Sequence, residues 1–323
     1  MIFKDIQQRL KPELERLNEY IMDSITAPMP LLNSIVQRYM QKRGKQVRPL
    51  LVILCAQLLG EINDRTLHSG AAIEILHNAS LIHDDVIDQS TTRRGEPTLN
   101  AVWNNHIAVL TGDYLLSKAL DESMKAESME IMKRMIFLSG KLTKGELYQI
   151  FLAREHEYSM RDYAKTIEMK TAILFESCAR IGAESVGVDE LEASSLIRYA
   201  YYLGMCFQIR DDVYDYQGNE AFGKDAGNDL REGKVTLPLI FALQNAPTEE
   251  CVAMKALLDK GDLSDEDVKT LTQFAVDNGG IEFCGQVMER LRQKAVRCLS
   301  RYKDCSARKD LEDIFTFIIN RDH

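Results

Sequence analysis

Proline is absent from the long stretch between Pro97 and Pro238. A proline inside a helix removes a backbone donor and clashes with the preceding turn, so a stretch without it is well suited to long helices. Apolar residues recur three and four positions apart in residues 162–183 and 190–216, whereas alternation with a period of two is scarcely seen. The pattern therefore predicts helices and gives no expectation of strands.

The chain also lacks zinc-type cysteine spacing, a signal peptide and a membrane-spanning run. Its seven cysteines show neither close pairing nor a matching histidine pattern, which favours core thiols in a reducing compartment. The amino terminus, MIFKDIQQRLKPELERL, mixes charged and apolar residues at helical spacing, and no later run reaches the roughly 20 apolar residues that a span requires. We therefore expect a cytoplasmic protein with no transmembrane segment.

Positive charge is in deficit, since 49 acidic residues face 40 basic ones and the net charge is -9. A general surface for nucleic acid or anionic membrane has no electrostatic support in such a chain. An anionic ligand must instead be met by a local group of basic residues or metal ions.

Linkers and internal repeats are missing as well. No Pro/Gly/Ser-rich tract divides the 323 residues, so we expect one all-α domain over residues 1–323. Ser264 and Asp267 form a helix-start signature, Gly279 follows the end of that segment, and Gly60 and Ser159 mark further helix boundaries. Residues 89–99 and 217–236 are expected to be irregular.

What the chain does contain is a repeated aspartate motif. Asp84, Asp85 and Asp88 lie in IEILHNASLIHDDVID, and a helix would place them within an arc of about 100°. The same spacing recurs in MCFQIRDDVYDY, at residues 211, 212 and 215. Carboxylates without histidine or cysteine partners favour a hard cation such as Mg²⁺, which also binds phosphate oxygens. A solvated acidic patch is the alternative, and the second copy in similar apolar context argues against it.

Basic residues that could bind a diphosphate occur near these motifs and elsewhere. An arginine can grip phosphate oxygens with a planar fork, and a lysine acts as a point charge. Each basic residue alone could equally be an ordinary surface charge, and His77 could be a core histidine. The candidates are Lys45, Arg48, Arg93, Arg94, Lys170, Lys224 and Lys234.

The order of the motifs resembles the trans-isoprenyl diphosphate synthases, and the likeness covers nearly the whole chain. It runs through GKQVRP at residues 44–49, His77, the first aspartate motif and RRG at 93–95. It continues through GE at 145–146, KTA at 170–172, FQ at 207–208, the second aspartate motif, GK at 223–224 and residues 229–238. The resemblance implies a helical bundle of the isoprenoid synthase type around a central apolar cavity. The implied activity is the extension of an allylic diphosphate by isopentenyl diphosphate.

The same resemblance implies roles for individual residues. Isopentenyl diphosphate would be held by Lys45, Arg48, His77 and Arg94. The allylic diphosphate would be held through Mg²⁺ by both aspartate clusters, Asp84, Asp85, Asp88, Asp211, Asp212 and Asp215, together with Arg93, Lys170, Lys224 and Lys234. Thr171 and Gln208 would face the allylic cation. A homodimer is also implied by the resemblance alone.

Product length should depend on the residues one helical turn before Asp84, which are Ala79 and Ser80. In the family, bulky side chains there close the channel early, so two small ones indicate a medium- or long-chain synthase, for example of the octaprenyl type. Phe137 is a candidate for the channel floor, although a plain core role is the simpler interpretation. Three alternatives stay open: a geranylgeranyl or farnesyl diphosphate synthase, a class I terpene cyclase, and a non-catalytic synthase subunit.

Overall fold

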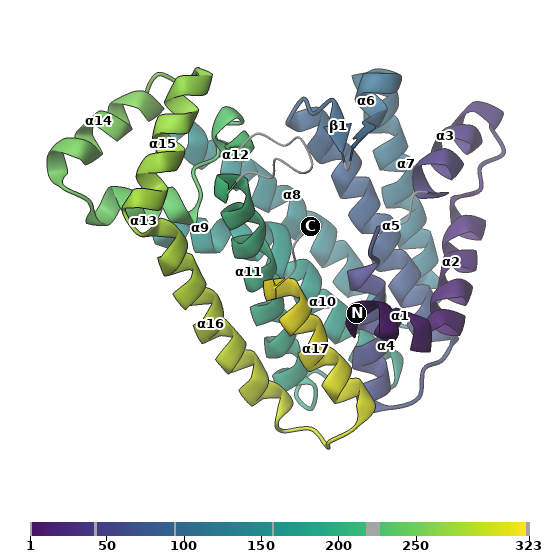
Figure 1. Ribbon diagram of the computed structural model, residues 1–323. Coiled ribbons are helices and arrows are strands. Elements are labelled where there is room, and N and C mark those ends of the chain that lie inside the picture. Colours follow the sequence, from purple (N-terminus) through teal and green to yellow (C-terminus); the bar gives the residue numbers. More distant parts are fainter. Residues whose placement is uncertain (1, 42–43, 94, 157, 218–226, 321–323) are drawn as a thin grey trace. The chain divides into compact units, whose positions relative to one another are not determined.

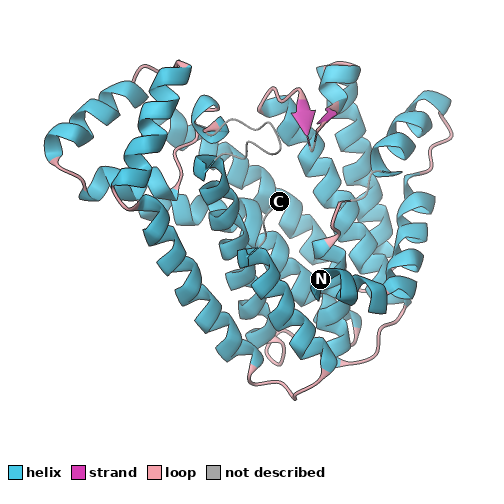
Figure 2. Cartoon of the chain, viewed as in Figure 1, coloured by secondary structure: helices cyan, strands magenta, loops and turns pink. Residues whose placement is uncertain are grey.

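The computed structural model describes residues 2–41, 44–93, 95–156, 158–217 and 227–320. Helices dominate the described chain, as Figure 2 shows, so the predicted all-α class is confirmed. The helices in the first half are α1 (Ile2–Arg9), α2 (Lys11–Ile25), α3 (Pro30–Gln41), α4 (Val47–Leu59), α5 (Asp64–Ile87), α6 (Leu99–Val102), α7 (Asn105–Met124) and α8 (Met129–Glu155). They are followed by α9 (Met160–Ile167), the π-helix η1 (Glu168–Ala172), α10 (Ile173–Ser185), α11 (Ser194–Gln217), α12 (Asn228–Arg231), α13 (Leu237–Asn245), α14 (Thr248–Leu258), α15 (Asp265–Asp277), α16 (Gly280–Leu299) and α17 (Ser306–Asn320).

The chain divides into two compact units. Unit 1 comprises Met1–Gly140, Phe175–Ile197 and Leu299–Ile314, and unit 2 comprises Lys141–Leu174, Arg198–Cys298 and Phe315–His323. The expectation of a single domain stays a prediction. Within the described ranges, no helix is both long and apolar enough to cross a membrane.

Helix α5 is the centre of unit 1 and packs against α2, α4 and α7 (Figure 1). It begins with a capping box, in which Asn63 accepts a hydrogen bond from the Thr66 amide and Thr66 accepts one from the Asn63 amide. Gly70 allows the close approach of α2, because a Cβ added there would lie 2.6 Å from Cδ1 of Leu17. The helix ends at Ile87, and Asp88 is its C-cap.

A short hairpin follows α5, contrary to the expectation of no strands. Strand β1 (Thr92–Arg93) pairs antiparallel with β2 (Glu96–Pro97). The turn between them contains Gly95 at φ +76°, a left-handed conformation that glycine adopts without strain. With two residues in each strand, the hairpin is too short to leave an alternating pattern in the sequence.

Unit 2 confirms the predicted helix boundaries. Ser264 and Asp267 form the expected capping box of α15, and Gly279 follows its end at φ +75°. Helix α13 packs against α9, α14 and α15. Apolar side chains of α13, α14 and α15 form a buried cluster that includes Leu239 and Leu271. Helix α12 is a correction, because four residues of the stretch predicted to be irregular are helical.

Candidate active site

Both aspartate motifs lie at the carboxyl ends of long helices. Asp84 and Asp85 stand in the last turn of α5 with Asp88 as its C-cap, and the second motif occupies the last two turns of α11. A helix carries about half a negative charge at this end, so carboxylates placed there are electrostatically unfavourable, by roughly 0.3–1 kcal/mol each on an exposed surface. A bound cation would remove this cost at both helix ends.

In unit 1, the structure pairs one predicted metal ligand with one predicted diphosphate ligand. Arg93 Nε donates a hydrogen bond to Asp85 Oδ1 at 2.7 Å, across the turn from β1 to the end of α5. Asp85 is 3% exposed, and this burial raises the pKa of its carboxyl group while Arg93 opposes the shift. The backbone of the turn is also fixed, because the Ser90 amide donates to the Asp85 carbonyl and Thr98 Oγ1 donates to the Ser90 carbonyl.

In unit 2, Asp212 stands at the end of a chain of hydrogen bonds. The sequence predicted some members of this chain as site residues, but not all of them. Thr171 Oγ1 donates to Gln208 Oε1 at 2.6 Å, and Gln208 Nε2 donates to Asp212 Oδ1 at 2.8 Å. The other oxygen, Oδ2, accepts a hydrogen bond from the Tyr163 hydroxyl at 2.5 Å. Burial raises the pKa of Asp212 to about 7, against the opposing effect of these hydrogen bonds. Three predicted site residues thus lie together, joined by Tyr163, which sequence reasoning missed.

Asp215 holds the start of α12. Its Oδ1 and Oδ2 accept hydrogen bonds from the backbone amides of Asn228 and Asp229 at 3.0 and 3.1 Å, and its carbonyl accepts one from Gly227 at 2.8 Å. Burial raises the pKa of Asp215, and it raises that of Asp229 more strongly, with Asp212 and Asp215 adding to the effect. Asp229 is therefore a further acidic neighbour of this motif, one that the spacing of the aspartates did not reveal.

Lys170 and Thr171 belong to the π-helix η1, which interrupts the predicted helix. Such wider turns are rare and occur frequently at functional sites. Helix α8 runs close to this turn, since a Cβ added to Gly145 would lie 3.0 Å from the Lys170 amide nitrogen. The Lys170 ammonium lies 2.6 Å from Glu146 Oε2 and 3.4 Å from Gln149 Oε1, so α8 fixes its position.

Of the four residues predicted to bind isopentenyl diphosphate, the three that the structure describes lie in unit 1. Lys45 is exposed just before α4, where its carbonyl accepts a hydrogen bond from Gln7. Arg48 is in the first turn of α4, with its guanidinium 5.2 Å from the centre of the Phe175 ring. His77 is half-buried on α5, and Arg94 lies outside the described residues. Their joint role stays a prediction.

Two lysines were predicted to help bind the allylic diphosphate from unit 2. Lys224 lies outside the described residues. Lys234 follows α12 with its ammonium 2.6 Å from Glu232 Oε2, and its side chain is 16% exposed. Lys234 is therefore held beside Glu232, the C-cap of α12, and its role towards a diphosphate stays a prediction.

The three residues predicted to set chain length lie on α5 and α8. Ala79 is buried, with 2% of its surface exposed, and Ser80 is half-buried with its hydroxyl donating to the His77 carbonyl. Phe137 is 45% exposed, and the Arg134 guanidinium lies 4.8 Å from its ring centre. The interpretation of Phe137 as a plain core residue is therefore wrong, because nearly half of its surface is exposed. Its role at the channel floor stays a prediction.

The donor set fits a metal ion that takes only part of its coordination from the protein. In the part of the chain that the structure describes, no three His, Cys, Asp or Glu side chains are gathered so as to hold a metal ion by themselves. Magnesium needs no such cage, because it takes one or two carboxylates and completes its octahedron with water and phosphate oxygens. Asp85 and Asp212, carboxylates buried at the negative ends of helices, suit that cation.

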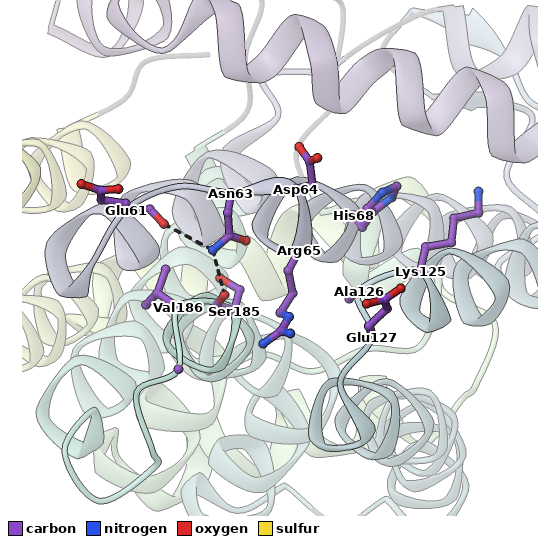
Figure 3. Close-up of a pocket in the computed structure, with 11 residues that line it drawn as sticks. Glu61, Asn63, Asp64, Arg65, His68, Lys125, Ala126, Glu127, Ser185 and Val186 are labelled. Carbon is purple, nitrogen blue, oxygen red and sulfur yellow. Dashed lines mark hydrogen bonds between the residues drawn. The ribbon is translucent and has the colours of Figure 1, made fainter.

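A separate polar hollow of about 840 Å³ lies in unit 1 at the amino end of α5 (Figure 3). Arg65, His68 and Lys125 line it together with Glu61, Asp64 and Glu127, so acids and bases balance. None of the predicted site residues is among its lining residues. The hollow is therefore distinct from the aspartate end of α5.

The fold is all-α, and the aspartate-rich ends of two helices suit a metal ion and a diphosphate. These features define a protein of the isoprenoid synthase class, and comparison with known proteins supports the same class. The model of the polyprenyl synthetase family matches residues 29–275, so the chain belongs to that family. Octaprenyl diphosphate synthase of Haemophilus influenzae is 30% identical over 324 residues, which cover 100% of this chain and 98% of that protein.

Solved structures resemble the fold over almost its full length. The polyprenyl synthase of Caulobacter crescentus CB15, crystallised with calcium and isoprenyl diphosphate, gives a TM-score of 0.93 at 29% identity and covers 99% of this chain and 98% of that one. Geranylgeranyl pyrophosphate synthase of Bacteroides thetaiotaomicron gives a TM-score of 0.85 at 34% identity, with 98% of each chain covered.

Proposed function

We propose that this protein is an all-trans polyprenyl diphosphate synthase of medium- or long-chain type, a prenyltransferase that joins isopentenyl diphosphate to an allylic diphosphate head to tail. The observation that carries the proposal is the aspartate motif repeated at the ends of α5 and α11, inside the region that the family model matches. An octaprenyl diphosphate synthase that aligns with the whole chain supports the product class.

We propose Mg²⁺ as the cofactor, held by the aspartates of the two motifs. The polyprenyl synthase of Caulobacter crescentus CB15, complexed with calcium and isoprenyl diphosphate, supports a divalent cation as cofactor here. When bound, such an ion neutralises a departing diphosphate, which lowers the barrier to breaking its bond to carbon.

The protein's own residues would then orient the reactants. The C–O bond of the allylic diphosphate breaks, and its electron pair leaves with the diphosphate. The alkene of isopentenyl diphosphate attacks the allylic carbon, and a proton is lost to the released diphosphate. Lys170, placed by Glu146, is a candidate to bind the diphosphate, and the oxygen of Thr171 is a candidate to face the cation.

The long-chain assignment is supported by the small, buried side chain of Ala79 one turn before the first motif. A shorter product is the second candidate, because the geranylgeranyl pyrophosphate synthase of Bacteroides thetaiotaomicron is 34% identical over 98% of the chain. Each added five-carbon unit would gain roughly 3–4 kcal/mol in an apolar channel, so an open channel would retain the growing product.

One experiment tests the proposed activity and product length together. The purified protein is incubated with Mg²⁺, labelled isopentenyl diphosphate and a series of allylic primers, and product lengths are measured. Linear products longer than 20 carbons are expected. Products that stop at 20 carbons or fewer would favour the shorter-chain alternative, cyclic products a terpene cyclase, and a lack of turnover a non-catalytic subunit.

We also propose a homodimer and a cytoplasmic location. The homodimer is supported by the family resemblance and by apolar side chains that unit 1 exposes on α7 and α8, including Leu110 at 66% and Ile136 at 51%. The molar mass in solution and the location of the tagged protein in fractionated cells test these two points.

A further inference from the structure

The carboxylate of Asp212 is fixed by donors from two different helices of unit 2. The Tyr163 hydroxyl, from α9, donates to Oδ2 at 2.5 Å, and Gln208, one turn before Asp212 on α11, donates to Oδ1 at 2.8 Å. Both helices are labelled in Figure 1. Tyr163 is 8% exposed and Asp212 is 3% exposed, so neither group can exchange its partner freely for bulk water.

The two donors are themselves oriented. Gln208 accepts a hydrogen bond from Thr171 at 2.6 Å, which fixes its amide with the nitrogen towards Asp212. Tyr163 lies in the first turn of α9, which Ser159 caps by accepting a hydrogen bond from the Asp162 amide. A carboxylate bonded through both oxygens cannot turn about its Cβ–Cγ bond without breaking a hydrogen bond, so its remaining lone pairs keep one direction.

A buried tyrosine on an amphipathic helix is usually a packing residue, and the ring of Tyr163 does pack in unit 2. Its hydroxyl, however, donates its only hydrogen bond to Asp212, which is the carboxylate of the second motif that is almost fully buried. Groups that bond to metal-binding carboxylates orient them, and their loss typically weakens metal affinity or activity by about 10–100-fold.

We infer that Tyr163 is a positioning residue that holds Asp212 in the orientation needed to bind a divalent cation together with a diphosphate. This inference rests on the proposed function, because it assumes that the second aspartate motif binds metal. Tyr163 itself would touch neither substrate nor metal, and would act only through Asp212.

The test compares Tyr163→Phe with the matched variant Tyr148→Phe. Tyr148 also belongs to unit 2, and its hydroxyl also donates to a carboxylate, Asp162 Oδ1, at 2.6 Å, but that carboxylate is outside both aspartate motifs. Mn²⁺ binding in the presence of inorganic diphosphate is followed by electron paramagnetic resonance, which needs no turnover. The Mg²⁺ concentration for half-maximal turnover and the melting temperature are measured in parallel.

Tyr163→Phe is expected to weaken Mn²⁺ binding by about 10–100-fold and to raise the half-saturating Mg²⁺ concentration by a similar factor. Tyr148→Phe is expected to bind Mn²⁺ as the wild type does, and both variants are expected to remain folded at the assay temperature, with the larger fall in melting temperature in Tyr163→Phe because its hydrogen bond is buried. In an Asp212→Asn background, Tyr163→Phe should cause no further loss of Mn²⁺ affinity, because the residue acts through Asp212.

Wild-type Mn²⁺ affinity in Tyr163→Phe, or an equal loss in Tyr148→Phe, would overturn the inference. So would failure of Tyr163→Phe to fold under conditions where Tyr148→Phe folds, since the hydroxyl would then be a stability element. A wild-type protein that binds Mn²⁺ with diphosphate but makes no prenyl product would refute the proposed function. The Mn²⁺ affinities of the wild type and Tyr163→Phe would still test the positioning role of Tyr163. A wild-type protein that binds no Mn²⁺ would overturn both.

Discussion

Glu122 Oε1 lies 2.6 Å from Nδ1 of His68, and the Glu122 side chain has no exposed surface. The second carboxylate oxygen lies 2.7 Å from the Lys125 ammonium. His68 also stacks on Tyr20, with ring centres 4.1 Å apart and planes 7° from parallel. These contacts tie α7 to α5 and α2 behind the polar hollow of unit 1, and they concern stability rather than catalysis.

Replacing Glu122 with Gln should lower the free energy of unfolding by about 2 kcal/mol. The amide keeps the size of the side chain but loses the charge of a buried carboxylate that strengthens two part-buried hydrogen bonds, each worth roughly 1.5–3 kcal/mol when one partner is ionised. Urea denaturation measures the change. The kinetic constants of the folded enzyme should remain those of the wild type.

Glu130→Gln is the matched control, because Glu130 pairs with Lys133 at 2.7 Å while both side chains are more than 60% exposed. An exposed pair of this kind contributes about 0.2–1 kcal/mol at most. Equal losses in the two variants would contradict the assignment of stability to the buried pair.

Removal of a motif aspartate should abolish turnover without unfolding the protein. Asp84→Ala and Asp211→Ala each delete one carboxylate from a helix end where negative charge is unfavourable, so their melting temperatures should be unchanged or slightly raised. Turnover should fall by at least about a thousandfold if each carboxylate holds a metal ion at the diphosphate. Asp121→Ala, an exposed aspartate on α7, is the control and should keep full activity. Near-normal turnover in either motif variant would refute the site.

The metal requirement should depend on pH because burial raises the pKa of Asp212 to about 7. Below that pH the carboxyl group holds a proton that a cation must displace, so the apparent affinity for Mg²⁺ should fall by up to about tenfold between pH 8 and pH 6. Turnover titrated with Mg²⁺ at several pH values measures this. A half-saturating concentration that is constant over this range would contradict the shift.

The same shift predicts how the stability of the metal-free protein changes with pH. An unfolded chain releases the Asp212 proton near its ordinary pKa of about 3.9, whereas the folded chain keeps it to about 7. The folded state therefore binds more protons between these values, and stability should decrease as the pH rises from 4 to 7. Asp212→Asn should show a weaker decrease in thermal melts over this range.

A bulky side chain at position 79 should shorten the product. Ala79 is buried on α5 about one turn before Asp84, so Tyr in its place would project a ring where the growing chain is proposed to pass. Ala79→Tyr should shift the product distribution by several isoprene units towards shorter lengths, measured by chromatography of the dephosphorylated products. General damage to the fold would lower total turnover with the lengths unchanged, and that pattern would argue against the channel.

Much of the fold followed from local signals in the sequence. The capping pair of Ser264 and Asp267 depends on residues three apart, and it is present in the structure. The position of Asp211 and Asp212 on a helix likewise followed from the apolar spacing of residues 190–216. Such features could be predicted because each is fixed by neighbours in the chain.

The unpredicted features depend on partners that are remote in sequence. Tyr163 donates to Asp212 across 49 positions, and within its own helix it has the pattern of a packing residue. The hairpin at Thr92–Arg93 is too short for strand periodicity, and the turn at Glu168–Ala172 looks like ordinary helix in its residue types. Tertiary contacts decide these features, so a local pattern cannot show them.

The π-helix η1 makes the protein more tolerant of a one-residue deletion there than in the middle of α11. A π-turn holds one residue more than an α-turn, so a deletion within Glu168–Ala172 could be absorbed by converting the turn to regular helix, leaving α10 in the same rotational setting. A deletion in the middle of α11 has no such reserve, and every later residue would rotate by about 100° around the axis. Gln208 would then turn away from Thr171, and Asp212 from Tyr163. We therefore expect single-residue deletions to be tolerated during evolution in η1 but not in the middle of α11.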